Sequence, residues 1–207
     1  MDRRPAPGLL PSDADIEALH RRLAPTAAAF RLVHTHCVIV AAIAGQLLAA
    51  RPQPVDAGLV RAGCLLHDVG VHRLYDAQGR LDRPNYLRHG ILGEQLLREL
   101  GHPDVLCRFC SHHTGVGLTR DDVVRHHLPL PVADYLAETP EEEVVMYADT
   151  FHSKSEPPAF VAPARARAQL ARFGADKVAR FDEFADRFGV PDLGPLAAAF
   201  GHAVQDA

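Results

Sequence analysis

The side chains in this sequence that could perform chemistry are histidines and aspartates spread over much of the chain. An adjacent pair, His67-Asp68, ends an apolar run, and further ligand-type residues lie on both sides of it. The complete set is His36, His67, Asp68, His89, His113 and Asp149. Neutral imidazoles and carboxylates are the usual ligands of divalent metals, and one carboxylate can bridge two ions. Six such groups exceed what one ion with an open coordination position needs, so the sequence predicts a dinuclear metal centre.

The chain contains 13 histidines among 207 residues, so a set of this kind could also be assembled by chance. The context of the His67-Asp68 pair argues against chance. Asp68 follows the apolar residues Leu65 and Leu66 and then His67, where an unpaired carboxylate would be costly to remove from water. A bound metal beside Asp68 would offset that cost.

This arrangement resembles the HD-domain family of metal-dependent phosphohydrolases. The family signature is a histidine on one helix, a His-Asp pair on a later helix and a distant aspartate, which here are His36, His67-Asp68 and Asp149. Residues 65–70 (Leu-Leu-His-Asp-Val-Gly) resemble the HDIG variant of the motif. Residues 89–93 and 113–117 resemble the two extra histidine segments of dinuclear members. The resemblance covers roughly residues 30–152, and it implies an all-α HD-domain helical bundle with a C-terminal helical extension.

Two of these positions have a second histidine nearby, and helix geometry favours one of each pair. Residues three, four, seven and eight apart share a helix face. The face that begins with His36 carries isoleucine, valine and leucine, whereas the face of His34 carries smaller residues, so we predict His36 as the ligand. By the same test His113 shares an apolar face, while His112 shares its face with Arg108. His34 and His112 stay alternatives, either as ligands or as donors that support them.

The resemblance implies a reaction in which a hydroxide that bridges two metals attacks phosphorus in line. The implied cofactors are two divalent ions, with iron or manganese favoured and zinc, cobalt, nickel or magnesium as alternatives. Besides Asp68, a candidate catalytic residue is Lys154, five residues after Asp149, as a cation for phosphate. His72 and His152 are candidate proton donors to the leaving group. Further candidate cations, each of which could equally be a solvated surface charge, are Arg73, Arg83 and Arg88.

Other functions are compatible with the same ligands. The six-ligand set also resembles that of mixed-valent di-iron oxygenases, a branch of the same superfamily that cleaves C–C or C–P bonds with dioxygen. A metal-binding or regulatory module without turnover is a third reading, which the complete ligand set disfavours. We predict a phosphohydrolase that acts on a small phosphorylated metabolite or nucleotide, and oxygen uptake with reduced iron would instead identify the oxygenase.

Composition restricts the partners and the compartment. The formal net charge is −4 and the basic residues are scattered, which argues against binding of duplex nucleic acid. No run of 18 apolar residues indicates a membrane span, and residues 1–5 lack the apolar stretch of a signal peptide behind them. Four cysteines in apolar helical stretches suit reduced thiols. Cys107 and Cys110 have metal-site spacing but no second pair, so we predict buried helix positions and a cytoplasmic protein.

The helices that must position these residues are recognisable from their caps and breaks. We predict helices over residues 12–23, 26–50, 56–70, 87–100, 103–113, 119–126, 139–152, 163–173, 175–188 and 192–205, with almost no strand. Residues 71–86 are predicted to form an irregular, functional loop. Residues 1–25 should form an N-terminal helix packed on the core, 26–156 the metal-binding domain and 157–207 its helical extension. Phenylalanines at helical spacing in the extension are predicted to pack in the core or in a homodimer.

Overall fold

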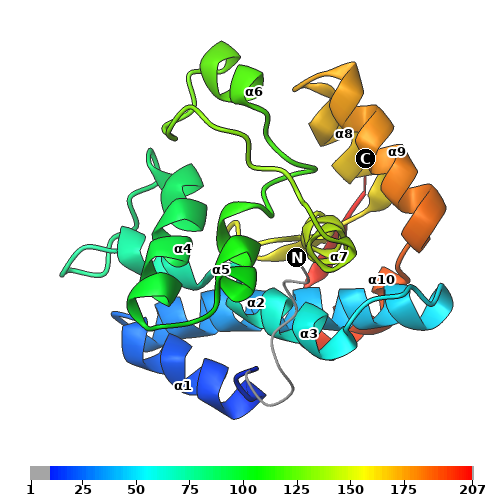
Figure 1. Ribbon diagram of the computed structural model, residues 1–207. Coiled ribbons are helices and arrows are strands. Elements are labelled where there is room, and N and C mark those ends of the chain that lie inside the picture. Colours follow the sequence, from blue (N-terminus) through cyan, green and yellow to red (C-terminus); the bar gives the residue numbers. More distant parts are fainter. Residues whose placement is uncertain (1–9, 207) are drawn as a thin grey trace.

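The computed structural model describes residues 10–206, and helices make up most of them (Figure 1). The α-helices run in the order α1 (Asp13–Leu23), α2 (Ala27–Ala50), α3 (Ala57–Leu66), α4 (His89–Glu99), α5 (Asp104–Ser111), α6 (Arg120–Arg125), α7 (Pro140–Asp149), α8 (Pro163–Ala171), α9 (Ala175–Phe188) and α10 (Leu193–Phe200). Two 3₁₀-helices, η1 (Val69–Leu74) and η2 (Tyr86–Arg88), lie between α3 and α4. The all-α prediction is confirmed, while the first nine residues of the predicted N-terminal segment lie outside the described residues.

The long helix α2 forms the base on which the other helices of the site are assembled (Figure 1). The hydroxyl of Thr26 caps its first turn by accepting from the backbone N–H of Ala29. By length and composition α2 could span a membrane, but half of its most apolar window is buried inside the protein. That composition is equally expected of a core helix, because α2 packs against α3 and α7 and carries a buried face that includes Val33, His36 and Val40.

Gly70 allows the segment after the His-Asp pair to approach α4 at backbone distance. A Cβ atom at this position would lie 2.1 Å from the carbonyl oxygen of His89 and 2.3 Å from the backbone nitrogen of Gly93. No side chain larger than hydrogen fits there without moving the backbone of α4. The glycine of the motif therefore sets how closely Asp68 and His89 can approach each other.

Three short strands depart from the predicted pattern of helices. Strand β1 (His152–Ser153) pairs antiparallel with β2 (Ala159–Val161), which pairs in parallel with β3 (Ala203–Gln205). The predicted helix over 139–152 ends at Asp149, and the one over 192–205 ends at Phe200. Gly201 terminates the latter with a left-handed φ of 69°. The predicted helix over 56–70 likewise stops at Leu66 and continues as η1, so the segment over 71–86 is partly helical.

Three phenylalanines of the C-terminal extension pack within their own chain, whereas Phe173 is 46% exposed. Phe181, Phe184 and Phe188 of α9 are buried, and their rings contact the ring of Tyr147 on α7. The hydroxyl of Tyr147 donates to the carbonyl of Gly189 at 2.9 Å, which fixes the end of α9 against α7. These three phenylalanines therefore pack in the core, which is one of the two predicted roles. The homodimer and the division of the chain into three segments stay predictions. All four cysteines are buried free thiols.

Candidate metal centre

Six separate positions along the chain bring the predicted ligands into one buried cluster. They lie on α2, at the end of α3, before η1, at the start of α4, after α5 and at the end of α7: His36, His67, Asp68, His89, His113 and Asp149. Five of these residues are buried, and the side chain of Asp149 keeps 20% of its surface exposed. The cluster divides into two groups of side chains that could each hold an ion.

The first group is formed by His36, His67 and Asp149. The Nε2 atom of His36 lies 2.9 Å from Oδ1 of Asp149 and 3.2 Å from Nε2 of His67. His67 in turn lies 3.5 Å from the same carboxylate oxygen. Three ligand atoms from α2, α3 and α7 therefore converge on one point, in a mixture of nitrogen and oxygen that suits a first-row divalent metal.

The second group is formed by His89, His113 and Asp68. The Nε2 atoms of the two histidines lie 3.0 Å apart. Oδ1 of Asp68 lies 3.2 Å from Nε2 of His89 and 3.7 Å from that of His113. The other oxygen of Asp68, Oδ2, lies 3.3 Å from His36 and 3.4 Å from His67. One carboxylate thus presents one oxygen to each group.

Hydrogen bonds on the far side of the rings test whether these residues suit a cation. His67, His89 and His113 each place Nδ1 against a backbone carbonyl, those of Cys64, Tyr86 and Phe109, at 2.7–3.0 Å. A carbonyl only accepts, so Nδ1 carries the hydrogen in all three rings. Burial lowers the pKa of His89 and His113, so these two rings are neutral and Nε2 of each carries a lone pair. The lone pairs of His89 and His113 therefore face each other, which a hydrogen bond between the rings cannot explain and a bound cation can.

Asp68 supplies the second test. Both of its oxygens are fully buried, and neither accepts a hydrogen bond of good geometry from the described residues. Although burial by itself raises the pKa of Asp68, the Lys154 ammonium and His67 hold that pKa well below its usual range. Burial lowers the pKa of His113 to about 3, so this imidazole is neutral, as a metal ligand must be. The donor set as a whole fits divalent metal ions.

Two pairs of histidines offered alternative ligands, His34 or His36 and His112 or His113. The structure brings His36 and His113 into the cluster. His34 instead stacks on the ring of Phe30, and His112 is held between Arg108 and Ser111. The thiol of Cys37, which the sequence analysis assigned to packing, also lies in the cluster. It falls within 4.8 Å of the ligand atoms of His67 and Asp68. Its only sequence signal is its place beside His36.

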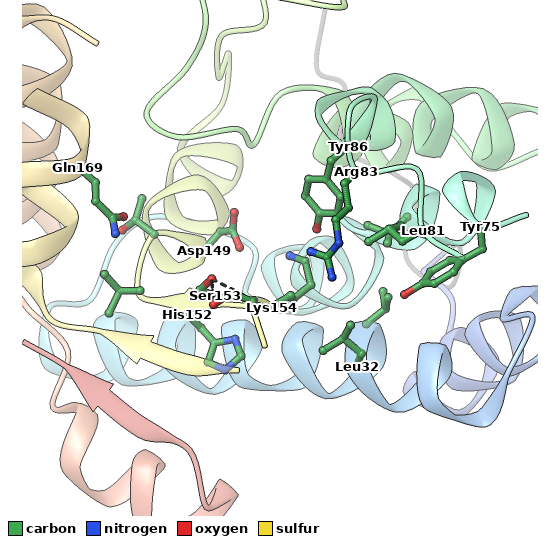
Figure 2. Close-up of a pocket in the computed structure, with 15 residues that line it drawn as sticks. Leu32, Tyr75, Leu81, Arg83, Tyr86, Asp149, His152, Ser153, Lys154 and Gln169 are labelled. Carbon is green, nitrogen blue, oxygen red and sulfur yellow. Dashed lines mark hydrogen bonds between the residues drawn. The ribbon is translucent and has the colours of Figure 1, made fainter. Parts of the chain in front are cut away.

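A cavity of about 460 Å³ opens beside the first group. Asp149, His152 and Lys154 line one part of it, and Arg83 and Tyr86 face them from the loop before α4 (Figure 2). Its remaining walls mix aliphatic side chains with polar ones such as Ser153 and Gln169. The sequence analysis did not single out Tyr86, although it lies one helical turn before His89.

The predicted catalytic residues take different positions around this cavity. Lys154 lies between β1 and the cluster, and its ammonium contacts Oδ2 of Asp68 directly. His152 lines the cavity, and its ring also contacts that of His36. His72 is buried, and its Nε2 lies 3.0 Å from Nδ1 of His20. Their roles as proton donors stay predictions.

The three candidate arginines differ in whether they line the cavity. The guanidinium of Arg73 is paired with Glu99 on α4. Arg83 lines the cavity, where its nearest acid is Glu156 at 3.9 Å and both side chains are mostly exposed. Such an exposed pair is weak, so the guanidinium can turn to a ligand. Arg88 does not line the cavity.

Comparison with known proteins identifies relatives of this part of the chain. The family description of the HD domain matches residues 33–154. An uncharacterized protein of Methanocaldococcus jannaschii is 37% identical over 117 residues. A tRNA (cytidine(56)-2'-O)-methyltransferase of Picrophilus torridus is 37% identical over 100 residues. These alignments cover 55% and 48% of this chain, which spans 62% of the first relative and 26% of the second.

Solved structures show the same fold. The HD domain of the L. monocytogenes phosphodiesterase PgpH superposes with a TM-score of 0.52 at 15% identity, over 89% of this chain and 98% of that one. The same domain in complex with cyclic-di-AMP gives a TM-score of 0.50, also at 15% identity, over 92% and 99% of the two chains. At this identity the likeness concerns the fold.

Proposed function

Because this chain belongs to the HD-domain family, we propose that it is a metal-dependent phosphohydrolase that hydrolyses a phosphate ester of a small metabolite or nucleotide. The observation that carries the proposal is the position of Asp68 between two groups of ligands, beside a cavity with a cationic wall. The phosphodiesterase activity named for the structural neighbours agrees with this reaction class.

We further propose that two ions bind, one in each group, with Asp68 shared between them. The shared carboxylate supports this number, as do His89 and His113, because an ion in the first group alone would leave the lone pairs of these two rings facing each other. When bound, such ions lower the pKa of water and stabilise negative charge on phosphoryl oxygens. Iron or manganese is the metal that we favour.

The side chains of the cavity would then position the substrate. Lys154 places a positive charge at the edge of the cluster, where it can contact a phosphoryl oxygen. Arg83, whose side chain is mostly exposed, supplies a second cation on the loop side, and Leu32 and Leu81 offer apolar contact to the rest of the substrate. A cavity of about 460 Å³ falls in the size range of small-molecule sites. We propose a cytoplasmic enzyme with a small substrate and no need for duplex nucleic acid or a membrane.

The test combines metal analysis with activity. Protein purified without added metal is analysed for its metals, then assayed with phosphomonoesters and phosphodiesters after loading with iron or manganese. We expect about two ions per chain and release of phosphate or of a monoester, both absent in Asp68→Asn.

Two outcomes would contradict the proposal. Oxygen consumption with reduced iron, without phosphate ester hydrolysis, would identify an oxygenase. Metal binding without turnover of any ester or of dioxygen would identify a binding module.

A further inference from the structure

Three histidine rings form a continuous chain from the candidate metal centre to the C-terminal strand. Nδ1 of His36 lies 2.8 Å from Nδ1 of His152. Nε2 of His152 lies 2.9 Å from Nδ1 of His202, which directly precedes β3. These contacts join residues that are 116 and 50 positions apart in the sequence.

His36 differs in this respect from the other three histidines of the cluster. His67, His89 and His113 each donate Nδ1–H to a backbone carbonyl, whose position is set by the helix that carries it. His36 has an imidazole as its partner instead. An imidazole can either donate or accept, so this partner does not by itself select the tautomer of His36.

Metal binding would fix the direction of the hydrogen bonds that join the three histidine rings. Without an ion, Nε2 of His36 can donate to Asp149, which would require His152 to donate inward. A metal bound at Nε2 requires a lone pair there, so Nδ1–H of His36 must donate to Nδ1 of His152. His152 then carries its hydrogen on Nε2 and donates to Nδ1 of His202. Each ring thereby holds the next in one tautomer.

The outer rings are firmly placed. His152 is buried, lies nearly coplanar with His202 at an angle of 21° between the rings, and contacts Phe160 on β2. Strand β3 pairs with β2 at Val204, and the N–H of Ala162 donates to the carbonyl of Gln205 at 3.0 Å. The position of His202 therefore depends on the docking of the C-terminal strand.

We propose that His152 and His202 are positioning residues of the metal centre, which hold His36 with Nε2 toward the metal and so couple metal binding to the docking of β3. The inference rests on the proposed metal centre and assigns a role to residues outside its ligand set. Partners that orient a metal-bound histidine commonly contribute about 10–100-fold to metal affinity.

The test is a titration of metal-free protein with Co²⁺, followed by the absorption of the bound ion. His152→Leu should bind the ion of the first group about 10–100-fold more weakly and alter its spectrum. His152→Asn should restore much of the affinity, because its amide oxygen can accept from Nδ1–H of His36. His202→Leu should cause a smaller loss in the same direction. His102 is a half-buried histidine that does not belong to the three contacting rings, so His102→Leu serves as the matched control. This variant should bind Co²⁺ as the unaltered protein does.

Nitrogen-15 spectra of the histidine rings give a second readout that packing alone would not change. In Zn²⁺-loaded protein, His152 and His202 should both carry hydrogen on Nε2. If His152→Leu does not fold, as judged by circular dichroism, the His202 variants and these spectra decide the matter.

The inference is overturned if His152→Leu binds Co²⁺ like the control, or if His152→Asn is as weak as His152→Leu. The proposed metal centre would survive either result provided that Asp68→Asn loses the ion. Failure of the unaltered protein to bind any metal would instead overturn the metal centre, and this inference with it.

Discussion

The ammonium of Lys154 contacts Oδ2 of Asp68, the carboxylate that faces both groups of the candidate metal centre. Although burial by itself lowers it, the pKa of Lys154 is raised above its ordinary value by Asp68 and Tyr86, so the lysine is charged. From the sequence, Lys154 was predicted to contact a bound phosphate and not the metal ligands. In the structure, Oδ2 of Asp68 faces both Lys154 and the histidines of the first group, so Lys154 would share this atom with an ion bound there.

Replacement of Lys154 by methionine should separate metal binding from turnover. Removal of the ammonium leaves Asp68 free for the ion, so we expect metal occupancy to be kept or to increase. Turnover of a phosphorylated substrate should fall roughly 5–150-fold, which corresponds to a loss of about 1–3 kcal/mol of transition-state stabilisation. Elemental analysis and kinetics on the same samples make the comparison. Lys154→Arg should lose less, and a variant that lost metal and activity together would contradict this separation.

The paired histidines give a test with built-in controls. His36→Ala and His113→Ala should each lose metal from one group, because their Nε2 atoms lie in the cluster. His34→Ala and His112→Ala should keep both ions, since these rings contact Phe30, and Arg108 with Ser111, instead. Metal titration of the four variants measures the difference, and retention of both ions in His36→Ala would remove it from the ligand set.

Gly70 and Gly45 form a matched pair for the same substitution. Gly70→Ala should destabilise the protein by at least about 2–3 kcal/mol and weaken metal binding, because the added Cβ meets the backbone of α4. Gly45→Ala, within α2 and with no atom within 4 Å of the added Cβ, should be neutral or stabilising by up to about 1 kcal/mol. Urea unfolding of both variants checks the prediction, which fails if the two midpoints move together.

The buried pair of Lys177 and Asp122 should make stability depend on pH. Burial by itself raises the pKa of Asp122, but hydrogen bonds from Lys177 and Thr119 lower it to about 2. A lowered carboxylate pKa contributes stability that is complete above the unfolded-state value and is lost as pH falls, here between about pH 4 and pH 2. In metal-free protein, the free energy of unfolding should exceed that of Asp122→Asn at pH 5, and the gap should shrink toward pH 2. A constant gap across this range would contradict the assignment.

Local sequence pattern was sufficient to predict most of the helices and the side chains that gather in one cluster, while their role as ligands stays a prediction. Helix periodicity selected His36 over His34 because a helix face repeats every three or four residues, and the structure places those two rings as predicted. Caps such as Thr26 and Thr139 marked where α2 and α7 begin, since the capping hydrogen bond joins neighbours in the chain.

Tertiary structure decided what depends on contacts between distant segments. Strand β3 was missed because it pairs with β2 across more than forty residues, and no short pattern marks such a pairing. The division of Asp68 between two groups follows from the way α2, α4, α5 and α7 converge on it. His202 gave no sequence signal, since its contact with His152 exists only once the C-terminal strand has docked. Residue types and local periodicity therefore determined which side chains could bind metal, and long-range packing determined how each one is held.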